Sequence, residues 1–249
     1  MKEEYTIYGI HAVTEAFDAG KEINKILVAK GLKNDQAEEV IKRARNQQIP
    51  VQFVPRESSV FPRQRNHQFV VALLSPISYH SLEDILPKLF EEGKNPFILV
   101  LDHITDVRNF GAISRSAYCA GVHAIVVPFE GAAPVNEDAV KTSAGALLKI
   151  PVCREKNFKS TMELLNQSGV TTVACTEKAN KDIAFVDLTG PVAIIMGSEE
   201  TGISSEVIKR CGSLVKIPLE QGVGSLNVSV AAGIAVYETV RQRMAAVQS

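Results

Sequence analysis

The sequence lacks tryptophan, and it contains only four cysteines in 249 residues. These cysteines are widely spaced, and no two of them form a CxxC pair: Cys119, Cys153, Cys175 and Cys211. We therefore predict neither a zinc site nor a disulfide framework, and we expect buried, reduced thiols and no metal. The chain also lacks an apolar run of the roughly 20 residues that a membrane span needs. Its opening residues, MKEE, lack the pattern of a secretory signal, so we expect a cytoplasmic protein with no membrane association.

Two nucleotide-binding signatures are missing as well. The chain has no GxxxxGK[ST] phosphate loop, and its one candidate for a GxGxxG fingerprint is incomplete. In that candidate Asn227 follows Gly222 and Gly224 in place of the third glycine, and the stretch precedes the last helix instead of following a first strand. These absences disfavour a P-loop NTPase and a dinucleotide-dependent enzyme.

An excess of positive charge is also absent, since 27 Lys and Arg residues are balanced by 28 Asp and Glu residues. Any contact with nucleic acid therefore has to come from a local patch. Residues 1–75 hold the best candidate, with 11 basic and 9 acidic residues. Their basic side chains cluster at two places, Lys42, Arg43 and Arg45, and then Arg56, Arg63 and Arg65. Such clusters are equally typical of a solvated face.

Residues 1–75 predict a small α/β domain of their own. We expect strands at 26–29, 51–54 and 69–74, and a helix over 36–47 that Asp35 caps. A second helix is expected after Gly9, with Ala12, Val13, Ala16 and Phe17 on its apolar face. Residues 76–95, with prolines and one short helix at 82–90, are predicted to be a linker.

Residues 96–249 predict a larger α/β domain. We expect strands at 97–101, 123–127, 171–175, 192–196 and 214–217, and helices at 111–120, 158–167, 204–210 and 226–244. Continuous apolar strands such as FILVL and VAIIM are typical of a parallel sheet covered on both faces. In such a sheet, ligands bind beyond the carboxyl ends of the strands.

Three loops after these strands carry glycine and small polar residues. The first leads to Arg115, which we place one turn into its helix, where a cation opposes the helix dipole unless an anion binds nearby. The alternative is a surface arginine paired with Asp102 or Asp106. The second loop, 197–202, either places Glu199 over the end of the sheet or carries only solvated glutamates.

The third loop, 217–227, opens the last helix, and we expect Ser225 to cap that helix. The helix is apolar around most of its circumference and therefore needs cover on two sides. A homodimer interface or deep burial within one chain would provide that cover.

In this order, the three loops resemble the motifs of the SpoU/TrmH-type RNA 2′-O-ribose methyltransferases of the SPOUT superfamily. The matching residues are Asn109, Gly111 and Arg115 in the first motif, Gly197, Ser198, Glu199 and Gly202 in the second, and Ile217-Pro218-Leu219 with Ser225-Leu226-Asn227-Val228-Ser229-Val230-Ala231 in the third. The opening stretch, residues 8–16 (YGIHAVTEA), is similar to the start of the family's small substrate-binding domain. The two-domain layout is most similar to the 23S rRNA guanosine-2′-O-methyltransferase subgroup.

The resemblance implies an α/β fold in two parts. Residues 96–249 would form a SPOUT domain with a parallel sheet and a deep trefoil knot, and residues 1–75 a ribosomal-protein-like substrate-binding domain. The implied cofactor is S-adenosyl-L-methionine, held by the backbone of Gly197, Ile217 and Leu226, in a homodimer formed through the C-terminal domain. Val107 stands in place of a usual proline, which would reshape the catalytic loop. Phe69 stands in place of a frequent glycine, which bears on the choice of RNA.

The implied activity is methylation of a ribose 2′-OH in structured RNA, most specifically a guanosine of 23S rRNA. The alternatives are a tRNA ribose 2′-O-methyltransferase and a nonenzymatic RNA-binding or ribosome assembly factor on the same fold. Because an arginine side chain stays protonated at neutral pH, we interpret Arg115 as binding the adjacent phosphate and stabilising the developing alkoxide. The residues expected to orient the reacting groups by hydrogen bonds are Asn109, Glu199, Ser225 and Asn227.

Overall fold

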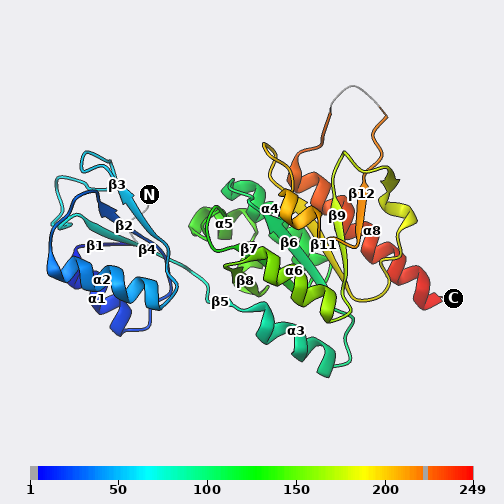
Figure 1. The fold of residues 1–249 in the computed structure, drawn as a ribbon, viewed down its shortest axis with the longest axis horizontal. Helices are drawn as coiled ribbons and strands as arrows, with labels where there is room; N and C mark the ends of the chain where they lie inside the picture. The colour runs from blue at the N-terminus through cyan, green and yellow to red at the C-terminus, as the bar shows by residue number, and fades with distance from the viewer. Residues whose placement is uncertain (1–4, 221–223, 249) are drawn as a thin grey trace. The chain divides into compact units, whose positions relative to one another are not determined.

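The computed structural model describes residues 5–220 and 224–248, which form two compact units (Figure 1). Unit 1 comprises the described residues up to Ser78 together with Pro134–Glu137. Unit 2 comprises Tyr79–Ala133 and the described residues from Asp138 onward. None of the described helices is both long enough and apolar enough to cross a membrane.

Unit 1 is built on a four-stranded sheet in the order β1-β4-β2-β3. Its elements are β1 (Thr6–Tyr8), α1 (Ile10–Asp18), β2 (Ile23–Ala29), α2 (Asp35–Asn46), β3 (Val51–Val54) and β4 (Val70–Leu74). β4 is antiparallel to β1 and β2, whereas β2 and β3 are parallel. Both helices cover one face of the sheet, where Val13 and Val40 join a core with Ile26 and Val28.

Three details of unit 1 differ from the sequence prediction. Asn34, and not Asp35, caps α2, because its side-chain oxygen accepts a hydrogen bond from the backbone N–H of Ala37 at 3.0 Å. Ala12 is exposed instead of buried, so the apolar face of α1 consists of Ile10, Val13, Ala16 and Phe17. The short strand β1 was not predicted from the sequence, since three residues carry little periodic signal.

Unit 2 contains an eight-stranded sheet in which every pair of neighbours is parallel, in the order β10-β12-β9-β11-β6-β7-β8-β5. Its strands are β5 (Tyr79–His80), β6 (Phe97–Asp102), β7 (Ala124–Pro128), β8 (Val152–Glu155), β9 (Thr171–Cys175), β10 (Lys181–Asp182), β11 (Val192–Gly197) and β12 (Ser213–Lys216). Its helices are α3 (Leu82–Glu91), α4 (Val107–Cys119), α5 (Glu137–Thr142, of which all but the first residue belong to unit 2), α6 (Phe158–Gln167), α7 (Ser205–Ile208) and α8 (Val228–Gln248). The predicted parallel α/β architecture is confirmed.

The order of the strands reverses beside β6. Strands β6, β7 and β8 follow one another in one direction, whereas β11 pairs with β6 on its other side and with β9 beyond. In an open parallel sheet, such a reversal leaves a crevice at the carboxyl ends of the two strands that flank it. The loops after β6 and β11 therefore begin at the place where this fold type binds ligands.

Both faces of the sheet in unit 2 are covered. On one face, Ile98, Val100 and Ile195 pack in a core with residues of α3, α6 and α7. α8 packs against α4 and contacts β11. Burial on both faces explains why β6 and β11 are apolar without alternation.

The predicted boundaries shift at several elements of unit 2. α4 begins four residues before the predicted start at Gly111, and α8 begins at Val228 instead of Leu226. α7 is shorter than predicted. Strands β5, β8 and β10 were missed because they are short or interrupted by charged residues. The prediction of buried cysteines is wrong for Cys119, which is exposed at the end of α4, and holds fully only for Cys153.

Candidate active site

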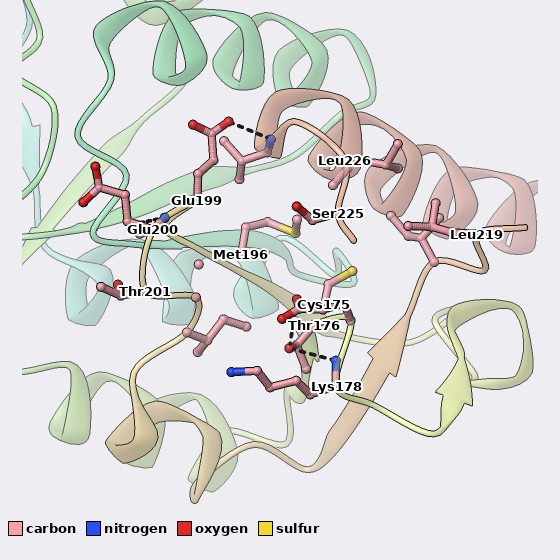
Figure 2. Close-up of a pocket in the computed structure, with 18 residues that line it drawn as sticks. Cys175, Thr176, Lys178, Met196, Glu199, Glu200, Thr201, Leu219, Ser225 and Leu226 are labelled. Carbon is pink, nitrogen blue, oxygen red and sulfur yellow. Dashed lines mark hydrogen bonds between the residues drawn. The ribbon is translucent and has the colours of Figure 1, made fainter. Parts of the chain in front are cut away.

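An open pocket lies at the carboxyl edge of the sheet in unit 2 (Figure 2). Its walls come from the ends of β9 and β11, the loop after each of them, the segment after β12 and the first turn of α8. The residues predicted to hold a cofactor, Gly197, Ile217 and Leu226, all line this pocket, together with Glu199 and Ser225. Segments far apart in the sequence thus share one cavity because parallel strands end at the same edge.

The loop after β11 folds tightly back on Gly197. A Cβ atom at Gly197 would lie 2.3 Å from the backbone atoms Gly202 C and Ile203 N, so no other residue fits here without moving the backbone. Ser198 and Gly202 form an isolated antiparallel bridge, with a hydrogen bond of 2.8 Å from Gly202 N to Ser198 O. The loop therefore forms a compact wall of the pocket.

A hydrogen-bonded cluster joins the three predicted motifs. Glu199 Oε1 accepts hydrogen bonds from Asn109 Nδ2 at 3.1 Å, from Asn227 Nδ2 at 2.9 Å and from the backbone N–H of Val228 at 3.2 Å. Asn227 Nδ2 also donates to Asn109 Oδ1 at 3.1 Å. Figure 2 shows the Glu199 side chain reaching toward the first turn of α8, whereas that of Glu200 points away from it. One carboxylate oxygen of Glu199 thus joins the loop after β11 to α4 and α8.

The start of α8 corrects the prediction about its cap. Asn227, and not Ser225, takes the capping position, since its Oδ1 accepts from Ser229 N at 2.9 Å and from Ser229 Oγ at 2.6 Å. Ser225 precedes the helix and is exposed at the pocket. Gly222, which precedes Gly224 in the incomplete GxGxxG stretch, lies outside the described residues.

The start of α4 also differs from the prediction, which moves Arg115 deeper into the helix. Asp106 caps this helix by accepting from Asn109 N at 2.7 Å, so the helix begins at Val107 and Arg115 lies more than two turns inside it. The prediction that Arg115 lies one turn into its helix is therefore wrong. Arg115 is exposed, and within the described part of the chain neither Asp102 nor Asp106 pairs with it. The alternative of a surface ion pair is contradicted as well.

Gly111, in the first motif, lies where α4 packs against α5 and leaves no room for a side chain. A Cβ atom there would lie 2.7 Å from Thr142 Cβ and 2.9 Å from the carbonyl oxygen of Ala139. The glycine thus lets α4 pack closely against α5, which sets the position of Asn109 one half-turn earlier.

The charge of the pocket suits a cationic ligand. Three carboxylates line it, Glu177, Glu199 and Glu200, against one ammonium, that of Lys178. The apolar part of the wall includes Met196 and the thiol of Cys175, whose pKa burial raises to about 11.

The loop after β9, with Thr176 and Lys178, was not predicted to contribute to the pocket, since it carries no glycine and no motif. Among the described residues, no group of three or more His, Cys, Asp or Glu side chains could hold a metal ion.

Unit 1 brings aromatic and basic side chains together in one loop, where Phe61 is buried, His67 and Phe69 are half-buried, and Arg56 and Arg65 are exposed. The rings of Phe61, His67 and Phe69 contact one another, with centroids 4.9–5.6 Å apart. The Arg56 guanidinium lies 5.1 Å from the Phe69 ring, and that of Arg65 lies 5.1 Å from the Tyr8 ring. We name the loop 55–69 with these side chains the aromatic–arginine surface. Elsewhere in the unit, Arg43 forms an ion pair with Asp18 at 2.6 Å and so has a structural partner.

A parallel sheet with an acidic pocket and a polar cluster at its carboxyl edge defines an α/β protein that binds a small ligand there. Comparison with known proteins then identifies the family. Residues 96–237 match the model of the SpoU rRNA methylase family, and residues 6–80 match a model described as RNA 2′-O ribose methyltransferase substrate binding.

Relatives of known sequence cover nearly the whole chain. YacO of Bacillus subtilis (strain 168), assigned to the TrmH family of tRNA/rRNA methyltransferases, is 35% identical over 243 residues, which are 98% of this chain and 97% of YacO. A TrmH family relative from Staphylococcus aureus (strain MSSA476) is 37% identical over 242 residues, 97% of each chain.

Solved structures agree with this assignment. An AdoMet-bound rRNA methyltransferase from Sinorhizobium meliloti superposes with a TM-score of 0.61 at 27% identity, over 95% of this chain and 87% of that one. The SpoU methyltransferase AviRb from Streptomyces viridochromogenes, at 24% identity, shares the fold with a TM-score of 0.61 over 96% of this chain and 90% of that one. The chain belongs to the SpoU rRNA methylase family.

Proposed function

We propose that this protein methylates a ribose 2′-OH in structured RNA and uses S-adenosyl-L-methionine as the methyl donor. The observation that carries the proposal is the cluster of Asn109, Glu199 and Asn227, which joins three motifs beside an acidic pocket. Membership of the SpoU family and the match of residues 6–80 to a 2′-O-ribose substrate-binding model support it.

The lining and the charge of the pocket support S-adenosyl-L-methionine as its ligand. Because there is no room for a Cβ atom at Gly197, the wall of the pocket consists of backbone atoms at this position. Ile217 and Leu226, from the segment between β12 and α8, also line the pocket. The excess of carboxylates matches the positive charge of a sulfonium and an ammonium group. When bound, the cofactor supplies a methyl group that the sulfonium already activates.

The residues of this chain would then position the ribose and stabilise charge. Arg115 binds the phosphate beside the target nucleotide and stabilises the alkoxide that develops at O2′. Asn109 and Asn227 hold the Glu199 carboxylate in place, so that α4, α8 and the loop after β11 keep one geometry. Ser225, exposed at the pocket, orients the groups at its mouth.

For the RNA substrate we propose a guanosine of 23S rRNA, on the strength of the two-domain layout. A tRNA ribose is the second candidate, because the relatives are named for tRNA and rRNA together. The aromatic–arginine surface of unit 1 is the proposed RNA contact, since the half-buried Phe69 ring and the exposed Arg56 guanidinium can stack on unpaired bases and bind phosphates.

We further propose a deep trefoil knot in unit 2 and a homodimer through α8. Val230, Ile234 and Tyr237 are exposed at positions i, i+4 and i+7 of this helix, and Tyr118 of α4 is exposed as well. An exposed apolar row on a helix is a typical partner surface. Sedimentation of the purified protein tests the dimer, and a monomer at micromolar concentration would contradict it.

Calorimetry with S-adenosylhomocysteine tests the cofactor, and mapping of 2′-O-methyl groups in rRNA and tRNA from a deletion strain tests the substrate. We expect binding at the pocket and the loss of one methyl group from 23S rRNA. Loss of a tRNA methyl group instead would establish the second candidate. Failure to bind the cofactor product, with RNA binding intact, would establish a nonenzymatic RNA-binding factor.

A further inference from the structure

Asp102, at the end of β6, is a buried carboxylate that the proposed mechanism does not use. Asp102 is only 1% exposed, and both of its carboxylate oxygens have hydrogen-bond partners. Oδ2 accepts from the backbone N–H of Ser204 at 2.6 Å, and Oδ1 lies 2.7 Å from the ring nitrogen Nδ1 of His103. Burial of a carboxylate is costly unless such partners compensate for lost water, so the arrangement calls for a role.

The Ser204 contact closes the base of the loop that forms the pocket wall. The loop leaves the sheet at Gly197, which is in register with Asp102 on the neighbouring strand. It returns to the same place, since Ile203 N lies against Gly197 and the next residue, Ser204, binds Asp102. The residues between, 198–203, all line the pocket, and Glu199, Glu200 and Thr201 lie along this loop in Figure 2.

The two ends of the loop are therefore held differently. At the entry, hydrogen bonds of the sheet between β11 and β6 hold Gly197. At the exit, the chain has left the sheet, and the short bond from Ser204 N to Asp102 connects it to β6. A hydrogen bond to a carboxylate in a buried position is stronger than a neutral one. Its removal would loosen the exit of the loop, where Ile203 is also buried in the core, without changing any residue that lines the pocket.

We propose that Asp102 is a positioning residue, which holds the loop 198–203 closed over the cofactor pocket through Ser204. The proposal rests on the proposed cofactor site, and it adds a residue that touches neither cofactor nor RNA. His103 is the hydrogen-bond partner of the second carboxylate oxygen of Asp102. The His103 ring packs against Gly131, where a Cβ atom would lie 2.7 Å from the imidazole Cδ2. Its backbone has a φ of 60°, a region that a residue with a side chain rarely adopts.

The test compares three variants for binding of S-adenosylhomocysteine by calorimetry. Asp102→Ala removes the acceptor, and we expect binding about tenfold weaker or more. Asp102→Asn keeps an acceptor oxygen for Ser204 N–H and an amide that can donate to His103, so we expect binding within about threefold of wild type. Ser204→Pro removes the donor and places the ring Cδ against Asp102 Oδ2, so the exit of the loop must move away from β6, while the φ of −60° at Ser204 suits a proline ring. We expect Ser204→Pro also to bind S-adenosylhomocysteine about tenfold more weakly or worse than wild type. This variant tests the proposal if Asp102→Ala folds poorly.

His103→Gly is the matched control. It removes the other partner of Asp102, relieves the positive φ, and leaves the bond to Ser204 in place. We expect its cofactor affinity to stay within about twofold of wild type. Hydrogen exchange should show faster exchange confined to the loop 198–203 and Ser204 in Asp102→Ala and Ser204→Pro, but not in His103→Gly.

Steady-state kinetics separate positioning from a general loss of structure. With saturating cofactor, the two loop variants should recover most of kcat, and the loss should lie in KM for the cofactor. Equal affinity in wild type, Asp102→Ala and Ser204→Pro would overturn the proposal, as would an equal loss of kcat at saturation. If wild-type protein itself binds no S-adenosylhomocysteine, the proposed function fails, which is a different result from unchanged affinity in the variants.

Discussion

The two units place their candidate functional residues on different supports. In unit 2, Asn109, Glu199 and Asn227 come from three segments that one parallel sheet brings to the same edge, and hydrogen bonds connect them. In unit 1, Arg56, Phe61 and Phe69 come from one loop and its flanks, and ring contacts connect them. The difference matches the proposed roles, in which unit 2 holds a fixed geometry for chemistry and unit 1 contacts RNA.

The same difference is visible at strained positions. Gly197 has no room for a side chain, so unit 2 uses the residue that its geometry demands. Phe69 has a φ of 58°, a region that favours glycine, yet unit 1 carries a phenylalanine there. Its ring packs with Phe61 and His67, which offsets the backbone strain. The positive φ explains why a glycine is compatible with position 69. The phenylalanine adds the ring contacts with Phe61 and His67.

The largest expected effect comes from Gly197→Ala. The new methyl group would lie 2.3 Å from backbone atoms of the loop, so the loop must move and the pocket loses its wall. We expect no measurable binding of S-adenosylhomocysteine by calorimetry, while RNA binding by unit 1 persists. Gly190→Ala is the control, because nothing lies within 4 Å of a Cβ there. Normal cofactor binding by Gly197→Ala would contradict the tight wall.

Substitution of Arg115 should reduce catalysis and leave cofactor binding unchanged. Arg115 is not among the residues that line the pocket. Its proposed role is to stabilise the negative charge that develops at O2′ during the reaction. Removal of one such stabilising group typically costs about 10²–10³ in kcat, which we expect for Arg115→Ala in a methyl-transfer assay. Arg115→Lys should recover part of the rate with an unchanged pH profile. Full activity of this variant with a shifted pH optimum would favour a role as a base.

Two exposed arginines of unit 1, Arg63 and Arg65, are expected to contact RNA. Arg63→Gln with Arg65→Gln should weaken RNA binding and lower the slope of log affinity against log salt by about one for each lost phosphate contact. Cofactor binding should not change, since neither residue belongs to unit 2. Lys42→Gln on α2 is the matched control from the other basic cluster. An unchanged salt slope in the double variant would remove the aromatic–arginine surface as the RNA contact.

The smallest expected effect is the pH dependence of stability at His123. Burial, and then the charges of Lys94 and Arg243, lower the pKa of this histidine. Its Nδ1 accepts from the backbone N–H of Phe97 at 2.9 Å, which requires the neutral ring. The unfolded chain therefore binds more protons, so this contribution is present above about pH 6.5 and is lost as the pH falls through the lower folded value.

Urea unfolding at pH 7.5 and 5.5 measures this contribution. His123→Asn, whose side-chain oxygen can also accept from Phe97 N, should show a smaller loss of unfolding free energy on acidification than wild type. His80→Gln, at an exposed residue, should behave as wild type does. Equal losses in wild type and His123→Asn would show that His123 does not contribute.

Much of the architecture could be predicted because it depends on local patterns. The apolar runs FILVL and VAIIM identified β6 and β11 and the parallel sheet, and the order of three loops indicated the family. Cap positions were less predictable, since Asn34 and Asp35, or Ser225 and Asn227, offer the same chemistry a residue or two apart. Short edge strands such as β5 and β10 form because a neighbour pairs with them, and no local signal marks them.

The sequence by itself determined the chemistry available to this protein: a balanced charge, no metal-binding cysteine pattern, and three loops with glycine, carboxylate and amide side chains. Only the tertiary structure decided how these groups meet. Register across β6 and β11 sets Asp102 beside Gly197, and the ends of parallel strands bring Asn109, Glu199 and Asn227 together. Contacts between residues about 90 to 118 positions apart depend on strand order, which no local pattern encodes.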